Sequence, residues 1–373
     1  MEDLPFDIRV YDKNFNFKAF VGDPITLTVT PRFNDTGTGA MAVETSHHAV
    51  PHLLADGARI VIKLRGTFLM SGKITRREAE GPNVDGIVTV YFKDDFRLLH
   101  QVLGWPVPNA ALTAQTSEYA VYSGNAESVV KAAVTANMTT RLGLPVTCAV
   151  NANRGLVVPT VRMRFHPLYE KLLPAVEQAG LGITFQQIGA GIVCDVYDPP
   201  VYARTLTEQN GIITGWSWSD EDPTATRVVA GGTGDAAARV FRDVKNLTLE
   251  AAHRDVFEVF RDARDADSAA LLTERAQETL TEGTPRAGFS VTLSESPHFQ
   301  YGQDGLVVGA QVTVAIGVAT RTDILREVTL TYSRDEGLVA VPTIGDVTSS
   351  PDRSIANFLA RMKKGVTDLK VSK

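Results

Sequence analysis

YGQDGLVVG, at residues 301–309, is followed by QVTVAIGV at 311–318, ILREVTLTYSR at 324–334 and VAVPTIGD at 339–346. In the last three segments apolar residues alternate with polar ones, and turns that contain glycine separate the segments. Because successive side chains of a β-strand point to opposite faces of its sheet, this alternation predicts β-hairpins. The region is therefore predicted to form part of a β-barrel or a β-sandwich.

The composition is that of an ordinary globular protein. The chain has 373 residues, of which 44% are hydrophobic and 21% are charged, and this length fits roughly two to three domains. A formal net charge of -6 gives no indication of a nucleic-acid-binding surface. The opening MEDLPFDIRVYD has no apolar signal region, and no run is long enough for a transmembrane helix.

Residues 1–112 are predicted to form a first antiparallel β-barrel. Strand patterns recur at 6–10, 25–33, 58–66 and 86–94, with turn residues between them. Several short strands without intervening helical periodicity are typical of an antiparallel barrel or sandwich. A short helix is expected within 94–104.

Residues 113–200 are predicted to be a small α+β domain inserted between two barrels. A helix is expected with Asn125 as its N-cap and Gly143 just past its end, because apolar residues recur four apart. A second helix is expected within 167–180, where Pro174 predicts a kink or a late start. Two alternating strands at 183–197 surround a Gly-Ala-Gly turn.

Residues 201–350 are predicted to return to strands and to form a second antiparallel β-barrel with an embedded helix at 268–283. Residues 351–373 are predicted to be a basic amphipathic helix or tail, because Ile355, Phe358, Leu359 and Met362 share one helical face. The expected fold class is thus mainly β, with two antiparallel barrels, a small α+β domain and a C-terminal helix.

The sequence contains no motif typical of catalysis. No GxSxG and no nucleophilic Cys with a nearby His occurs. GGTGDAAAR at 231–239 resembles a P-loop but lacks the GK[ST] ending and precedes a strand pattern, so a tight hairpin is predicted there. Cys148 and Cys194 are expected to be buried free thiols, with a disulfide as the less favoured alternative. We predict no enzyme, no cofactor and no metal site, although the sequence leaves open a carboxylate pair for glycoside hydrolysis.

Three histidines also need a structural interpretation. His47, His48 and His52 lie around Pro51, with no carboxylate at ligand spacing. Such imidazoles are usually solvated or hydrogen-bonded to the backbone, so we do not expect them to bind a metal.

Two groups of residues are candidates for an interface. Arg242, Arg254, Arg261 and Arg264 are each followed by Asp, and adjacent residues on a strand face opposite sides, so each member would meet a cross-strand or cross-subunit partner. Either an interface ladder or a solvated face fits this pattern. Trp216 and Trp218 alternate in GWSWSD, where they could pack in a hairpin core, fill an interface or stack on sugars.

The order of barrel, α+β insert, second barrel and terminal helix resembles the minor tail proteins, or central tail-hub proteins, of long-tailed siphoviruses of actinobacteria. These are in turn similar to the baseplate-hub proteins of contractile-tailed phages. The segments that carry the resemblance are GARIVIKLRGTFLMSGKI at 57–74, GIVTVYFKDDFRLL at 86–99, LYEKLLPAVEQAGLGITFQ at 168–186, VFEVFRDARD at 256–265, YGQDGLVVGAQVTV at 301–314 and VPTIGD at 341–346. Gly309-Ala310 departs from the more usual Gly-Asp.

The resemblance implies hub-type barrels and a homotrimer that closes the distal end of a phage tail tube. It implies a structural virion protein at the tail tip, made in the cytoplasm of the bacterial host, that forms the channel for DNA ejection. Its expected partners are the distal tail ring, the tape measure and the tail-tip or receptor-binding proteins. Phage DNA would pass transiently without specific binding, and the host envelope would be contacted only indirectly. The alternative is a virion-associated protein that binds or hydrolyses cell-wall glycan.

Overall fold

The computed structural model describes residues 4–82, 86–209, 211–235, 238–264, 266, 268–293, 300–317, 319–335 and 337–345. The helix predicted at 351–373 lies outside the described residues. The chain divides into two compact units, Met1–Trp216 with Val291–Ile344, and Ser217–Ser290 with Gly345–Lys373. The domain limits predicted from the sequence, at 112, 200 and 350, are not decided by this division and stay predictions.

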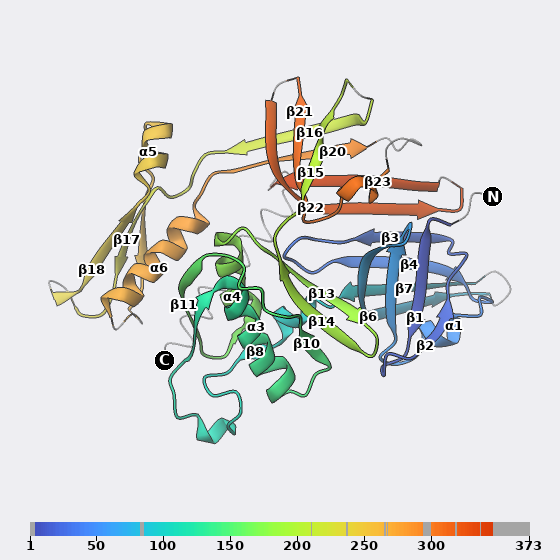
Figure 1. The fold of residues 1–373 in the computed structure, drawn as a ribbon, viewed down its shortest axis with the longest axis horizontal. Coiled ribbons are helices and arrows are strands. Elements are labelled where there is room, and N and C mark those ends of the chain that lie inside the picture. The colour runs from blue at the N-terminus through green and yellow to red at the C-terminus, as the bar shows by residue number, and fades with distance from the viewer. Residues whose placement is uncertain are drawn as a thin grey trace. The chain divides into compact units, whose positions relative to one another are not determined.

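A large sheet forms the framework of the first unit (Figure 1). Its N-terminal elements are β1 (Phe6–Tyr11), β2 (Phe17–Phe20), β3 (Thr26–Thr30), β4 (Thr38–Glu44), α1 (Val50–Leu53), β5 (Arg59–Leu64), β6 (Thr67–Glu80), β7 (Ile87–Asp94) and α2 (Arg97–Gln101). Alternation in β1 buries Phe6, Ile8 and Val10. The strands predicted in this region are confirmed.

The C-terminal strands join this same sheet. They are β15 (Val201–Thr207), β16 (Ile213–Glu221), β20 (Arg286–Leu293), β21 (Gln311–Ile316), β22 (Ala319–Ser333) and β23 (Gly337–Gly345), with the short 3-10 helix η4 (Gln303–Gly305) before β21. The strand order is β16-β20-β23-β22-β3-β4-β7-β6-β5-β1-β2, and β21 and β15 branch from β22. Figure 1 shows β22 beside β3, where Leu330 pairs with Val29.

The length of β22 explains the branch. Its first half pairs with β21, where Ile324 lies opposite Gln311, and its second half pairs with both β3 and β23. Among the described strands no ladder closes this path into a barrel. The mainly β fold class is confirmed, and two closed barrels remain a proposal. Alternation predicts a strand but does not determine its partner, because pairing depends on which strand comes alongside it in space.

The α+β region lies between β7 and β15. Its elements are β8 (Leu103–Gly104), η1 (Leu112–Ala114), β9 (Ala120–Asn125), α3 (Ala126–Val134), η2 (Thr135–Arg141), β10 (Val146–Cys148), β11 (Val157–Met163), β12 (His166–Pro167), α4 (Leu168–Gln178), β13 (Gly182–Ile188) and β14 (Gly191–Tyr197). As predicted, the Asn125 side chain caps α3 by accepting the N–H of Ser128 at 2.8 Å. The predicted hairpin of β13 and β14 is also confirmed.

Two helix predictions need correction. The helix that begins at α3 changes type at Thr135 and continues as the π-helical segment η2. In η2 the Asn137 amide donates to the Ala133 carbonyl and accepts the N–H of Trp105, so a side chain enters the backbone hydrogen-bond ladder. Helix α4 begins directly after Pro167 and runs unbroken through Pro174, so the late start is wrong. Pro174 is exposed, and water can reach the carbonyl that its missing N–H leaves unbonded.

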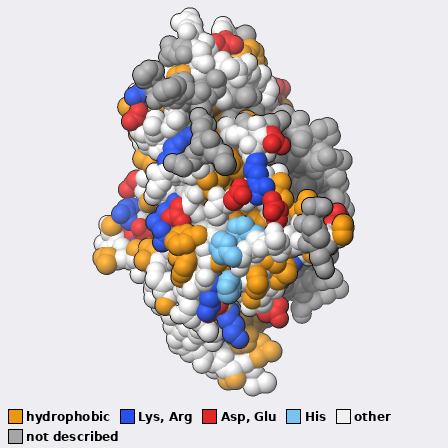
Figure 2. Space-filling view, turned by 90° about the vertical axis from the view of Figure 1, so that its right-hand side faces the viewer, with side chains coloured by type: hydrophobic (Ala, Val, Ile, Leu, Met, Phe, Trp, Pro, Cys, Tyr) orange, Lys and Arg blue, Asp and Glu red, His pale blue; other side chains and the backbone are white. Residues whose placement is uncertain are grey.

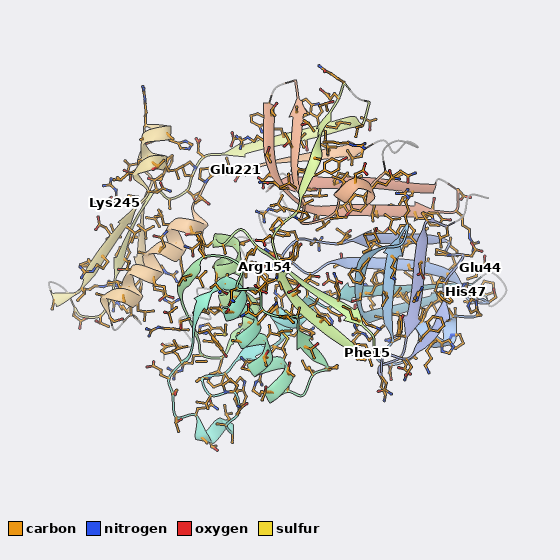
Figure 3. The ribbon with its side chains drawn as sticks, in the orientation of Figure 1. Phe15, Glu44, His47, Arg154, Glu221 and Lys245 are labelled. Atoms are coloured by element: carbon orange, nitrogen blue, oxygen red, sulfur yellow. The ribbon has the colours of Figure 1, made fainter. Side chains whose placement is uncertain are left out.

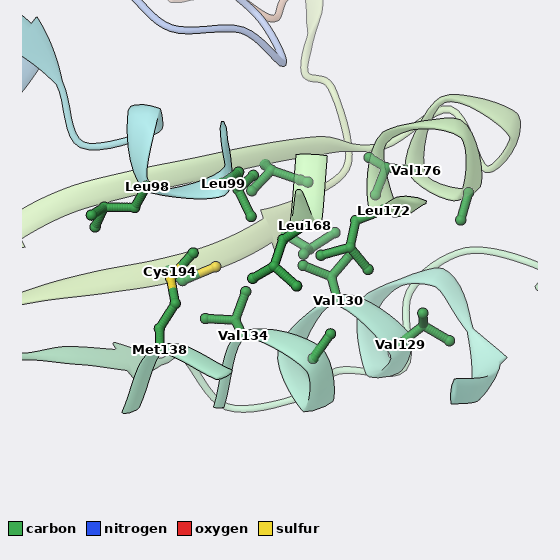
Figure 4. Close-up of a cluster of buried hydrophobic side chains, with 14 of the residues drawn as sticks. Leu98, Leu99, Val129, Val130, Val134, Met138, Leu168, Leu172, Val176 and Cys194 are labelled. Atoms are coloured by element: carbon green, nitrogen blue, oxygen red, sulfur yellow. The ribbon is translucent and has the colours of Figure 1, made fainter. Parts of the chain in front are cut away.

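Apolar side chains from α2, α3, α4 and β14 form the core of this region (Figure 4). Val130, Val134, Leu168 and Leu172 are fully buried in it. The helical spacing recognised in the sequence therefore marks the face that packs against the strands.

A buried polar cluster attaches β13 to the large sheet. The Arg59 Nη2 lies 2.5 Å from Asp95 Oδ2, and their side chains are 6% and 0% exposed. Ser71 Oγ donates to Asp95 and accepts the N–H of Gln187 at 2.8 Å, while Arg59 Nε donates to Gln187 Oε1 at 2.8 Å. The Phe15 ring covers the guanidinium at 4.6 Å. Three strands are thus joined through one ion pair, which we call the Arg59 cluster.

Asp95→Ala is expected to lower the free energy of unfolding by about 3–5 kcal/mol, because it leaves the Arg59 charge buried without its carboxylate. Urea denaturation measures the loss. The control is Asp7→Ala, which breaks the half-exposed Arg9–Asp7 pair and should cost less than about 1 kcal/mol. Equal losses for the two variants would contradict the role given to the Arg59 cluster.

Candidate interface on the second unit

The second unit is built on a three-stranded sheet with one covered face. Its elements are β17 (Arg227–Gly231), β18 (Phe241–Lys245), α5 (Leu247–His253), β19 (Glu258–Asp262) and α6 (Ala269–Glu282). β17 lies in the middle, antiparallel to β18 and parallel to β19. Val228 and Ala230 of β17 are fully buried in a core with Leu272 and Leu280 of α6. Residues two apart therefore face α6, and those between them face away.

The sequence predicted most of this unit. The helix at 268–283 is confirmed, since the Ser268 side chain caps α6 and Gly283 ends it. The hairpin predicted around 231–239 is confirmed, because β17 and β18 pair on either side of that segment, but it is not tight, since the paired strands end at Gly231 and resume at Phe241. The helix at 268–283 is not, as was expected for residues 201–350, the only one between β15 and β20. After Lys245 the Asn246 side chain accepts the N–H of Leu249 at 3.0 Å and starts α5, so the apolar residues that follow belong to a helix.

The face of the sheet turned away from α6 carries two aromatic rings. Phe241 pairs with Gly231, and Phe260 pairs with Val229, so these side chains lie on one side. Phe241 is 49% exposed and Phe260 is 55% exposed. We call Val229, Gly231, Phe241 and Phe260, with the charged residues around them, the open face. Half-exposed aromatic side chains in one patch are characteristic of interaction sites.

Arg239 holds the centre of the open face. Its Cζ lies 5.7 Å from the Phe241 ring centroid and 5.5 Å from that of Phe260. Its guanidinium donates to the carbonyls of Gly231 at 2.9 Å and Gly232 at 3.1 Å, and it pairs with Asp262. A Cβ at residue 231 would lie 2.8 Å from Arg239 Cζ, so glycine leaves the space that the guanidinium fills.

Two further ion pairs lie around the open face. Arg227 lies 3.0 Å from Glu250, and Lys245 lies 2.6 Å from Asp243. The hydrogen bond from Lys245 lowers the pKa of Asp243. Figure 3 labels Lys245 among the side chains of this unit. Paired charges next to exposed aromatic rings suit a protein surface rather than a nucleic-acid backbone, whose binding needs unpaired Lys and Arg.

The four arginines that were candidates for an interface all belong to this unit but do not form one ladder. Arg242 and Arg261 both pair in register with Ala230, which places them on the α6 side of the sheet. Arg254 ends α5 with φ of 52°, and Arg264 follows β19, 3.7 Å from Asp262. Their interface role stays a prediction. Sequence reasoning missed Arg239, Phe241 and Phe260. Phe260 lies between the half-buried Val259 and Arg261, whereas both neighbours of Phe241 are exposed.

Trp216 and Trp218 lie on β16, two residues apart, so their side chains share one side of the strand. They are 40% and 43% exposed. Trp216 Nε1 donates to Glu208 Oε1 at 2.7 Å. Both rings are therefore accessible, and their role also stays a prediction.

Other candidate sites offer less chemistry. His47 and His48 stack at 4.4 Å, and His47 Nδ1 accepts the N–H of Ala49, as expected for histidines bonded to the backbone. Figure 2 shows histidines grouped on one face, and Figure 3 labels His47 near Glu44. Within the described ranges no group of three or more His, Cys, Asp or Glu side chains is placed to hold a metal ion. No described helix is long and apolar enough to span a membrane.

The first unit contains a cleft of about 520 Å³. Apolar side chains dominate its lining, including Leu64, Met70, Phe96, Ile183, Phe185 and Val308. Asp94 is its buried acid, and burial raises the pKa of this carboxyl to about 8. Asp195 also lines the cleft, so the carboxylate pair for glycoside hydrolysis that the sequence left open is not decided by this lining.

The described fold is shared with phage tail proteins. It is similar to the tail protein from Neisseria meningitidis MC58, with a TM-score of 0.58 and 12% identity over 91% of this chain and 96% of that one. It is also similar to the 43 kDa tail protein of prophage MuSo2 from Shewanella oneidensis, with a TM-score of 0.57 and 10% identity over 93% and 99% of the two chains. The prophage tail protein gp18 from Listeria monocytogenes EGD-e gives a TM-score of 0.55 and 11% identity over 97% and 99%.

Residues 7–346 match the family of Siphovirus ReqiPepy6 Gp37-like proteins, and the chain belongs to this family. The resemblance to siphovirus tail proteins inferred from the sequence is thereby confirmed. No curated protein sequence matches the chain significantly.

Arg239→Ala is expected to destabilise the sheet of the second unit by about 2 kcal/mol, because two carbonyl hydrogen bonds and two ring contacts are lost. Hydrogen exchange of peptides from β17, β18 and β19 should accelerate by about 30-fold. Arg264→Ala serves as the control, since Arg264 is exposed, and exchange should stay within about twofold of the parent protein. Equal exchange in the two variants would show that Arg239 does not hold the open face.

Proposed function

We propose that this chain is a structural virion protein, the hub that closes the distal end of a phage tail tube. In this proposal three copies form a ring whose lumen is the channel for DNA ejection. The observation that carries the proposal is the nearly complete overlap with three proteins named as tail proteins, which extends over at least 91% of this chain and 96% of theirs. Family membership over residues 7–346 agrees with it.

A structural role fits the chemistry of the described residues. The net charge of -6 disfavours tight binding of a phosphate backbone, so DNA can pass without being retained. We propose that the neighbours of the ring are the distal tail ring, the tape measure and the tail-tip or receptor-binding proteins. The protein would then reside at the tail tip of the virion after synthesis in the host cytoplasm, and it would act without catalysis.

We further propose that the open face contributes the contact between copies. Phe241, Phe260 and Arg239 belong to the residue types that are enriched in protein interfaces, and their surroundings carry paired charges. Burial of the two half-exposed rings would give the sheet a second apolar contact on the face opposite its small core, in which five of the nine buried residues are alanine. Arg242 and Arg261 flank the sheet on its other side and remain candidates for a second contact.

The parent protein is expected to be a trimer in solution, and the double variant Phe241→Ser with Phe260→Ser is expected to be a monomer. The reason is that polar serine removes the apolar area available for burial. Size-exclusion chromatography with light scattering measures the mass of each. Phe17→Ser is the matched control, because Phe17 is 46% exposed on the first unit and should leave the trimer intact.

The outcomes of this experiment separate the two proposals. A parent protein that is monomeric at all accessible concentrations contradicts the trimeric hub. A double variant that remains trimeric contradicts only the open face as the contact.

A second candidate function is adhesion to cell-wall glycan. The favouring observation is the pair of accessible rings at Trp216 and Trp218 on one side of β16, since aromatic faces stack on sugars. The hub proposal predicts no retention of the protein by purified bacterial cell walls and no clearing in a wall zymogram. Retention that falls at least tenfold in Trp216→Ala would instead establish the adhesin.

A further inference from the structure

Cys148 and Cys194 lie side by side in the insert region. β10 pairs in parallel with β14, and the two cysteines are Cα partners in that ladder. Neighbouring strands are about 4.8 Å apart, and directly paired residues point to the same face. This separation falls within the roughly 4.4–6.8 Å between Cα atoms that a disulfide spans. Both cysteines are free thiols in the structure.

The two thiols differ in access. Cys194 is fully buried in the core, and Figure 4 shows it close to Met138. Cys148 is only half-buried, and its sulfur lies 3.5 Å from Thr135 Oγ1 and 3.6 Å from the Lys131 carbonyl. A small oxidant can therefore reach Cys148 first, with Cys194 immediately behind it. β10 has only three residues and lies at the edge of its sheet, so it can make the small adjustment that bond formation needs.

The electrostatic surroundings favour ionisation of the accessible thiol. A hydrogen bond with the Cys194 thiol lowers the pKa of Cys148 to about 7, against the effect of burial. Lys131 on α3 also lowers this pKa, whereas Asp195 on β14 raises it. The same hydrogen bond and burial raise the pKa of Cys194 well above its usual range. At neutral pH one thiol is thus substantially a thiolate and its partner is protonated.

We propose that Cys148 and Cys194 form a site of oxidative modification, in which a peroxide converts the two thiols to an intramolecular disulfide. The Cys148 thiolate attacks one peroxide oxygen, the O–O bond breaks, and with one proton the products are a sulfenic acid at Cys148 and water. The Cys194 sulfur then attacks the Cys148 sulfur, the S–O bond breaks, and the hydroxide that leaves takes the Cys194 proton. Two thiols lose two electrons and peroxide becomes two waters.

The bond would tie an edge strand to the centre of its sheet. β10 is held in the sheet by β14 alone, and β14 lies between β10 and β13. A covalent link at Cys148 would prevent β10 from separating. The consequence for a protein that is synthesised in a reducing cytoplasm is that the insert region becomes stiffer after release into an oxidising medium. The chemistry itself does not depend on the proposed hub function.

The experiment treats the purified full chain with hydrogen peroxide and follows its intact mass and its alkylatable thiols. The expected product loses both free thiols and about 2 Da, and peptide mapping joins Cys148 to Cys194. The initial rate is expected to rise about tenfold from pH 6 to pH 8, as the Cys148 thiolate population grows. The midpoint of thermal unfolding is expected to rise by about 3–8 °C in the oxidised protein.

Single variants identify the two roles. Cys194→Ala should stop at Cys148 sulfenic acid, which a dimedone probe labels, and Cys148→Ala should leave Cys194 reduced under the same treatment. Gains of about 16 or 32 Da without loss of both thiols in the parent protein would overturn the proposal. A disulfide found only between two chains would also overturn it. Both outcomes are measured on the parent protein, so the test does not depend on a variant that folds.

Discussion

The ion pair of Arg59 and Asp95 is the contact on which the organisation of the first unit depends. Both side chains are almost completely buried, and removing such charges from water is costly unless their remaining hydrogen-bonding groups are occupied. Ser71 donates to Asp95 Oδ2, Gln187 accepts from Arg59 Nε and the Phe15 ring covers the guanidinium, whereas Asp95 Oδ1 is buried without a hydrogen-bond partner. A buried pair of this kind contributes little net stability compared with apolar packing. Displacing β13 would, however, remove Gln187 from Arg59 Nε and from Ser71 Oγ and leave these buried groups without that hydrogen bond. The Arg59 cluster therefore fixes position rather than adding binding strength.

Asn34 strengthens the same attachment. Its amide accepts the N–H of Ile183 at 2.8 Å and donates to the Leu181 carbonyl at 3.0 Å, which satisfies the start of β13. Because β13 pairs with β14 throughout its length, the position of β14 follows. Cys194 and Asp195 lie on β14 in the insert region, so the surroundings of both residues depend on the Arg59 cluster.

A second buried network continues from Asp195. Lys131 Nζ lies 2.8 Å from Asp195 and 2.6 Å from the fully buried Glu127, which also accepts the N–H groups of Ala152 and Arg154. Burial alone would raise the pKa of Glu127, yet these hydrogen bonds outweigh it and the pKa lies below its ordinary value. Glu127 therefore stabilises the fold above its unfolded-state pKa, and this contribution is lost as pH falls through the folded-state value. The loop before β11, where Figure 3 labels Arg154, is held by charge rather than by apolar burial.

These networks also show what the sequence could and could not predict. Alternation identified β1, β5 and β7, and the caps at Asn125 and Ser268 fixed two helix starts, because both signals are local. The pairing of β22 with β3 joins residues about 300 positions apart, and no local pattern encodes it. The position of Arg239 over Gly231 could not be predicted either, because no local pattern encodes this contact. From the sequence, Gly231 was interpreted as a turn residue. In the structure, the absence of a side chain at residue 231 leaves space for the guanidinium of Arg239, which therefore lies next to the exposed rings of Phe241 and Phe260.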